Sequence, residues 1–186
     1  MTGNNLESHL ETTFNTVSEW LKFAEAKNAG LVALNGITLS ASVTYLSSET
    51  RNTVWTAGLS VGVVCFAVSS LIALISFLPE VGLSRVLRQH HGRISPQSDN
   101  LLFFEHLKKY KPDELVQAVS EKYGLDTGSQ QLCQDLAAQI TANARIASRK
   151  NTLFTLGAWV TLIGAILVPI VAFTAWLTQV VTQHRL

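Results

Sequence analysis

The sequence predicts an all-α integral membrane protein with three transmembrane helices and a helical cytoplasmic region. The composition is the first reason, because 47% of the 186 residues are hydrophobic and the mean hydropathy is +0.25, both high for a soluble domain. The second reason is that residues 28–48, 52–79 and 151–183 contain no Asp, Glu, Lys or Arg. Each stretch is long enough to cross the hydrocarbon core, which takes about 20 residues of helix.

Residues 1–27 are predicted to form a cytoplasmic amphipathic helix. Apolar side chains recur along it at steps of four and three, at Leu6, Leu10, Phe14, Val17, Leu21 and Ala24. From Leu6 onward neither Pro nor Gly interrupts the chain before Gly30. We therefore expect one helix to run from the cytoplasm into the first span.

Residues 28–79 are predicted to form a transmembrane hairpin, with spans at about 28–48 and 54–78. The link from Glu49 to Asn52 is too short for anything but a tight turn. Asn35 is the most polar group deep in the first span, and we expect it to hydrogen-bond to a neighbouring helix.

Small residues at helix-packing spacing occur in all three spans. They are Gly36 with Ser40, Gly58 with Gly62, and Gly157 with Gly164. Such spacing lets two helices approach closely, and packing within one subunit is favoured over a dimerisation face.

Residues 80–150 are predicted to form a cytoplasmic helical region. Ser98 and Asp99 can cap a helix from Asn100 to Tyr110, and a second helix should begin at Pro112 and stop at Gly124. A third carries the apolar stripe Leu132, Leu136, Ile140, Ala144 and Ala147. We expect it to continue without a break into the third span, residues 151–180, which leaves residues 181–186 as a short outer tail. The stripes at 6–24 and 132–147 should pack together.

The distribution of basic residues predicts the orientation. Ten of the 14 Lys and Arg residues fall between residues 85 and 150, and Lys22 and Lys27 precede the first span. Only Arg51 and Arg185 lie on the opposite side. The positive-inside rule then places the N-terminus and residues 80–150 in the cytoplasm.

Several function classes lack their expected residues. The formal charge of +1 gives no overall field that would attract nucleic acid. The sequence contains no GxSxG, P-loop, HExxH or GxGxxG motif, and the adjacent His90 and His91 would point to different sides of a helix or strand. We therefore expect no catalytic residue, no metal site, no cofactor and no enzymatic activity. Neither a disulfide between Cys65 and Cys133 nor a cleaved signal peptide is expected.

A basic set of side chains is more suggestive. It comprises Arg88, Arg93, Lys108, Lys109, Arg145, Arg149 and Lys150. Arg and Lys bind phosphate well, so these residues can form a pocket for a small phosphorylated ligand. The same residues also satisfy the positive-inside rule and can contact lipid phosphates, and charge alone leaves both interpretations open.

Three short segments, in their order and spacing, resemble the transmembrane effectors of the Pycsar antiphage systems (PycTM). The segments are Ala24-Glu25-Ala26-Lys27-Asn28, Asp99-Asn100-Leu101-Leu102-Phe103-Phe104-Glu105-His106 and Ala147-Ser148-Arg149-Lys150. By the pattern of spans, the resemblance covers about Leu21 to Leu177.

The resemblance implies that a companion cyclase makes cyclic CMP or cyclic UMP on phage infection. The protein would then be a multi-pass protein of the cell inner membrane that senses this nucleotide through residues 80–150, assembles as a homo-oligomer in the lipid bilayer and impairs the membrane, causing abortive infection. By residue type and proximity to the motif, the candidate ligand-binding residues are Arg88, Arg93, Asn100, Phe103, Phe104, His106, Lys108 and Lys109.

Two alternatives remain open at this point. The chain can be a constitutive membrane anchor or scaffold whose cytoplasmic bundle recruits a partner, in which case nothing depends on a nucleotide. A membrane-bound phosphohydrolase would instead need metal-dependent turnover involving His91 and His106.

Overall fold

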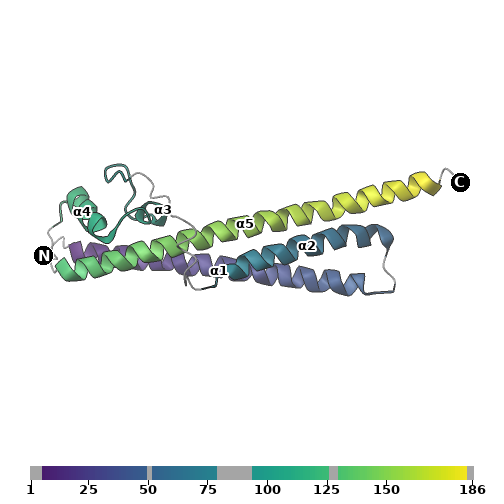
Figure 1. The fold of residues 1–186 in the computed structure, drawn as a ribbon, viewed down its shortest axis with the longest axis horizontal. Coiled ribbons are helices and arrows are strands. Elements are labelled where there is room, and N and C mark those ends of the chain that lie inside the picture. The colour runs from purple at the N-terminus through teal and green to yellow at the C-terminus, as the bar shows by residue number, and fades with distance from the viewer. Residues whose placement is uncertain (1–5, 50–51, 79–93, 126–129, 184–186) are drawn as a thin grey trace. The chain divides into compact units, whose positions relative to one another are not determined.

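The computed structural model of the chain describes residues 6–49, 52–78, 94–125 and 130–183. The elements are α1 (Leu6–Leu46), α2 (Thr53–Ile75), α3 (Phe104–Leu107), α4 (Pro112–Tyr123) and α5 (Gln130–Gln183), shown in Figure 1. By length and composition α1, α2 and α5 can each cross a membrane. The all-α membrane fold with three spans is therefore confirmed, as are the unbroken helices that contain the first and third spans.

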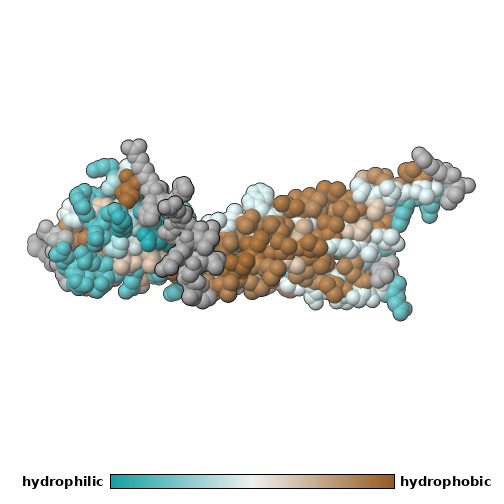
Figure 2. Space-filling view, viewed as in Figure 1, coloured by the Kyte–Doolittle hydropathy of each residue, from teal (hydrophilic) through white to brown (hydrophobic). Residues whose placement is uncertain are grey.

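The chain divides into two compact units. The polar unit comprises Met1–Glu25 and Pro79–Asn151, and the membrane unit comprises Ala26–Leu78 and Thr152–Leu186. The helices α1 and α5 contribute residues to both. On the face drawn in Figure 2, hydrophobic residues cover the helices of the membrane unit, whereas hydrophilic residues dominate the surface of the polar unit.

One apolar core holds the polar unit together. It contains residues of the predicted α1 stripe and of α3, α4 and α5, which confirms that the two long helices share a core. The stripe on α5 starts one residue later than predicted, because Leu132 is 38% exposed and Cys133 is fully buried. Cys133, Ala137, Ile140, Ala144 and Ala147 follow steps of four and three, which track one helix face, whereas repeated steps of four drift around it.

The helix predicted from Asn100 to Tyr110 is much shorter in the structure, where α3 covers only Phe104–Leu107. The Asn100 side-chain oxygen accepts a hydrogen bond from Leu102 N at 3.0 Å, and Asn100 N donates to His106 Nδ1 at 2.7 Å. Such local bonds compete with helical ones and favour turns. The predicted bounds of α4 are confirmed, since Gly124 follows its last residue in the left-handed conformation (φ 61°).

Glycines allow close helix packing inside the membrane unit. A Cβ on Gly58 would collide with the Val168 carbonyl oxygen, and one on Gly164 would lie 2.7 Å from the Cβ of Cys65. Packing within one chain is thus confirmed for these glycines. It is wrong for Gly36, where an added Cβ would meet none of the described residues within 4 Å.

A closed hydrogen-bond network, here called the membrane node, joins all three helices of the membrane unit. Asn35 donates to Ser69 Oγ at 2.8 Å and accepts from Thr161 Oγ1 at 3.0 Å. Ser69 Oγ lies 2.8 Å from both the Gly157 carbonyl oxygen and Thr161 Oγ1. The expectation that Asn35 binds a neighbouring helix is confirmed, because its bonds reach both α2 and α5.

Candidate functional site

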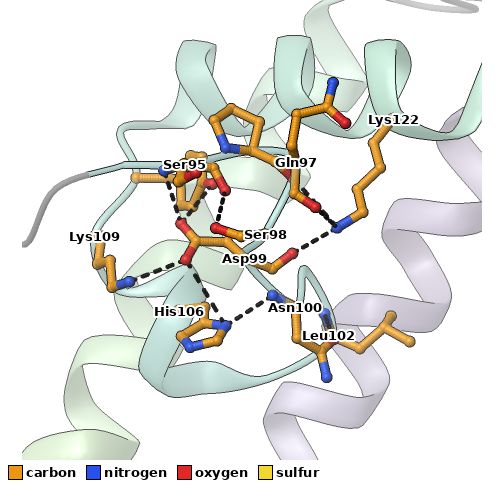
Figure 3. Close-up of polar contacts among 11 residues, drawn as sticks. Ser95, Gln97, Ser98, Asp99, Asn100, Leu102, His106, Lys109 and Lys122 are labelled. Carbon is orange, nitrogen blue, oxygen red and sulfur yellow. Dashed lines mark hydrogen bonds and ion pairs between the residues drawn. The ribbon is translucent and has the colours of Figure 1, made fainter.

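The segment Asp99–His106, here called the motif segment, is organised around the buried carboxylate of Asp99 (Figure 3). Its Oδ2 atom accepts hydrogen bonds from Ser95 N at 3.1 Å and from the Tyr110 hydroxyl at 2.9 Å. Its Oδ1 atom accepts from Lys109 Nζ at 3.1 Å in a salt bridge. We call Ser95, Asp99, Lys109 and Tyr110 the Asp99 node.

The electrostatics of the Asp99 node keep the carboxylate ionised. Burial alone raises the pKa of Asp99, but hydrogen bonds from Ser95, Lys109 and Tyr110, together with the Lys109 charge, outweigh burial and hold the pKa below its usual range. Burial, followed by the contact with Asp99, raises the pKa of Tyr110, so its hydroxyl remains a hydrogen-bond donor. The node therefore pairs an anion with one cation and two neutral donors.

Lys122 fastens the segment before Asp99 to α4. Its ammonium group donates to the carbonyl oxygens of Pro96 at 3.2 Å, Gln97 at 3.4 Å and Asp99 at 2.6 Å. Figure 3 shows the lysine side chain reaching these carbonyls from α4. A cation that binds three carbonyl oxygens fixes the backbone path on which the Asp99 side chain depends.

Three of the predicted ligand residues lie together at this node. Lys109 binds Asp99, and His106 Nδ1 accepts from Asn100 N while lying 4.0 Å from the Asp99 carboxylate. The same ring nitrogen therefore faces both the Asn100 backbone and the Asp99 carboxylate. Asn100 itself is exposed.

Lys108 faces a different group of partners. Its ammonium donates to Glu105 Oε2 at 2.5 Å and to Ser148 Oγ of α5 at 2.8 Å. Arg145 donates to the backbone carbonyls of Lys108 at 3.2 Å and Tyr110 at 3.0 Å. The burial of Glu105 raises its pKa, but the bonds from Lys108 and Ser148 and the Lys108 charge lower it overall. The segment after α3 is thereby held to α5.

The two predicted aromatic residues pack around Trp20 of α1. Phe104 is buried in the core with its ring centroid 5.8 Å from that of Trp20, whereas Phe103 is half-buried at 6.5 Å from Trp20. Phe103 also meets His106 edge to face at 5.8 Å. Phe103 therefore borders the Asp99 node, and Phe104 serves the core.

The structure does not describe two of the predicted ligand residues, and it adds others that the sequence did not indicate. Arg88 and Arg93 lie outside the described residues. Sequence reasoning missed Tyr110 and Lys122, and it interpreted Asp99 as a helix cap. In the sequence, Lys109 and Lys122 follow Asp99 by 10 and 23 positions. Such separations do not by themselves indicate that the residues are in contact.

A cavity of about 400 Å³ lies elsewhere in the polar unit, between α4 and the start of α5. It is lined by Asp113, Val116, Gln117, Ser120, Glu121, Gln130 and Gln134. None of the predicted ligand residues lines it, and its two carboxylates would repel a phosphate. Among the described residues, no three His, Cys, Asp or Glu side chains gather closely enough to hold a metal ion.

The comparison with protein families accounts for most of the chain. The Pycsar effector protein domain (PycTM) matches residues 9–177, a range that includes α2, the Asp99 node and most of α1 and α5. Searches of curated proteins and of solved structures found no match. The resemblance seen in the sequence is confirmed, and the chain belongs to the PycTM family of Pycsar antiphage defence effectors.

Proposed function

We propose that this effector senses a cyclic pyrimidine mononucleotide, cCMP or cUMP, at the Asp99 node and in response impairs the inner membrane. The observation that carries the proposal is the gathering of Lys109, His106 and Asn100 around one buried carboxylate, with the Phe103 ring beside them. A pyrimidine nucleotide offers a phosphate anion, a base edge with donors and acceptors, and a flat ring. These residue types complement all three.

Exchange of anions at Lys109 is the proposed trigger. A cyclic nucleotide phosphate carries one negative charge and would compete with the Asp99 carboxylate for the ammonium group. Among the described residues, losing Lys109 would leave the buried carboxylate hydrogen-bonded to Ser95 N and the Tyr110 hydroxyl, with His106 Nδ1 at 4.0 Å. A buried charge without its counter-ion is unfavourable, so ligand binding would favour a second arrangement of the segment around residue 99.

Two helices offer a route from this unit to the bilayer. Both α1 and α5 continue without a break from the polar unit into membrane-spanning segments. At the end of the polar unit, Lys150 Nζ of α5 lies 3.2 Å from Glu25 Oε1 of α1, so the two helices are joined there. We propose that a shift at the Asp99 node passes along these helices, and that the effector acts as a homo-oligomer without turnover of the nucleotide.

The binding step is tested with the full chain in lipid nanodiscs. Calorimetry should detect binding of cCMP or cUMP to the protein, and weaker or no binding of cAMP and linear 5′-CMP. Lys109→Gln should abolish binding, because it removes the cation proposed to bind the phosphate. Lys111→Gln is the matched control, since Lys111 is exposed and pairs with Glu114 rather than Asp99. Equal binding by both variants would overturn the assignment of the site.

The membrane step is tested in liposomes loaded with a fluorescent dye. Addition of the bound nucleotide should release dye from liposomes that contain the protein, and the nucleotide should be recovered chemically unchanged. Leakage without nucleotide, or no leakage despite binding, would contradict a ligand-gated effector. Stable capture of a cytoplasmic protein with no nucleotide dependence would favour a constitutive anchor instead.

The proposal places the N-terminus and residues 80–150 in the cytoplasm, where a cyclase would release its product. Reporter fusions test this orientation. A fluorescent protein fused at residue 1 should fold and emit in the cytoplasm, and alkaline phosphatase fused after residue 186 should be active outside the inner membrane. The reverse pattern would separate the node from its proposed ligand.

A further inference from the structure

The polar unit exposes a patch of aromatic side chains on α1. Trp20 is 39% exposed and Phe23 is 52% exposed, and their ring centroids lie 6.4 Å apart. They are three positions apart, so they share one face of the helix. Large aromatic rings at such exposure are unusual on a unit whose other exposed residues are mainly polar, and they indicate an interaction surface.

The core holds this patch in place. One side of the Trp20 ring faces the buried Phe104, at 5.8 Å between centroids, and the half-buried Phe103 lies at 6.5 Å. The Trp20 ring is therefore packed on one side and available on the other. A fixed, amphipathic ring of this kind is suited to the zone between hydrocarbon and water.

The position of the patch along α1 is that of a lipid headgroup contact. Phe23 and Trp20 precede Ala26, the first residue of the membrane unit, by about 4–5 Å and about 9 Å along the helix at 1.5 Å per residue. The headgroup region on each side of a bilayer is about 5–8 Å thick. Phe23 thus falls within the headgroup depth and Trp20 at its outer edge, on the same helix that contains the first span.

Charge supports the same partner. Lys22 is exposed next to Phe23 in the sequence, and Arg149 and Lys150 occupy the last turn of the polar unit on α5. The ion pair between Glu25 and Lys150 places that turn beside the α1 segment that carries Phe23. Lys22 and the half-buried Arg149 thus offer cationic groups to the phosphates of anionic lipids, whereas the charge of the buried Lys150 is balanced by Glu25.

We infer that Trp20 and Phe23 form an interfacial anchor, inserted among the headgroups of an anionic bilayer on the side of the polar unit. Trp20 also touches Phe103 and Phe104 of the motif segment, so the anchor and that segment share one aromatic cluster. The inference does not depend on nucleotide binding.

Lipid-resolved fluorescence quenching tests the anchor. The full chain with Trp55→Phe, Trp159→Phe and Trp176→Phe retains Trp20 as its single tryptophan, and the three replaced residues are exposed in the membrane unit. A matched variant retains only Trp159, in the middle of the third span. Both are reconstituted in phosphatidylglycerol-containing liposomes with lipids brominated near the headgroup or deep in the acyl chain, and iodide serves as the aqueous quencher.

The anchor predicts that shallow bromines quench Trp20 more than deep ones and that iodide quenches it weakly. Trp159 should be quenched most by deep bromines, which verifies insertion. Quenching of Trp20 by iodide alone would place it in water, and protection from all quenchers would mean that protein covers it. Either result overturns the inference. Phe23→Trp in a background with all four tryptophans replaced by Phe repeats the measurement without relying on the Trp20 side chain.

Discussion

Each unit of this protein is fastened by a buried hydrogen-bond network, and the two networks differ in charge. The Asp99 node joins a carboxylate to an ammonium group and two neutral donors, whereas the membrane node consists only of amide, hydroxyl and carbonyl groups. Lys109 remains 22% exposed, so its charge keeps part of its hydration. No such hydration is available in hydrocarbon, where a charge is far more unfavourable than a neutral polar group.

The two networks differ in which hydrogen-bond partners they can exchange. In the membrane node, Asn35 and Ser69 are fully buried. The hydroxyl hydrogens of Ser69 and Thr161 are shared among three contacts: Ser69 with Gly157, Thr161 with Asn35, and Ser69 with Thr161. Among the described residues, the groups of this node can exchange hydrogen bonds with one another. In the Asp99 node, Lys109 is partly exposed, so under the proposed mechanism an anion from solution would compete with Asp99 for its ammonium group. A ligand trigger therefore suits the polar unit better.

Removing the anion of the Asp99 node should have the largest effect on stability. Asp99→Ala leaves Lys109 and the buried Tyr110 hydroxyl without their shared partner, and we expect it to destabilise the polar unit by about 3 kcal/mol. Hydrogen exchange of residues 95–123 in nanodiscs measures this loss. Asp135→Ala, at an exposed position on α5, is the control and should change exchange little. Equal protection in both variants would argue against a structural role for the node.

A methyl group at a helix contact should have the next largest effect, in the membrane unit. Gly58→Ala forces its Cβ against the Val168 carbonyl and should destabilise the bundle by about 2 kcal/mol. Gly36→Ala adds the same methyl group where nothing lies within 4 Å, so it should be neutral or slightly stabilising. Unfolding in sodium dodecyl sulfate followed by circular dichroism compares the two. Equal losses would show that helix packing does not distinguish these glycines.

Breaking the membrane node should have a smaller effect, about 1 kcal/mol, because interhelical hydrogen bonds in membranes are individually modest. Ser69→Ala removes the hydroxyl that contacts Asn35, Thr161 and Gly157. Ser70→Ala is the neighbouring control, since among the described residues the buried Ser70 hydroxyl finds no hydrogen-bond partner. The same detergent unfolding should show a loss for Ser69→Ala only. A loss of equal size for Ser70→Ala would assign the effect to helix α2 in general.

Acid should have the smallest effect on stability, and it should affect the Asp99 node but not the membrane node. The pKa of Asp99 is lower in the folded chain, so its contribution to stability is present above the unfolded value, 3.8, and is lost as pH falls through the folded value. At pH 3.8 the loss from this group should be at most about 0.4 kcal/mol and should grow on further acidification. Hydrogen exchange of the polar unit against pH measures it. The part of this loss due to Asp99 should be absent in Asp99→Ala, whereas Glu105, whose pKa is also lowered, loses its contribution with acid in both proteins. The membrane node has no ionisable group and should not respond.

The sequence by itself determined the features that arise from local chemistry and periodicity. Uncharged apolar stretches specify the three spans, and the period of 3.6 residues specifies the buried face of α1. Pro112 and Gly124 specify the bounds of α4, because proline suits a first helical turn and glycine adopts the left-handed conformation at low cost. The family could also be recognised, because its short segments occur in a fixed order along the chain.

Only the tertiary structure decided which polar and small residues meet. Asp99 looked like a helix cap, and it became the hub of a node because Lys109, Tyr110 and the backbone held by Lys122 converge on it. Gly36 and Gly58 look alike in the sequence, yet only Gly58 lies against a neighbouring helix. The physical reason is common to both cases. A contact between residues far apart in the chain depends on how whole helices pack, and no local pattern encodes that arrangement.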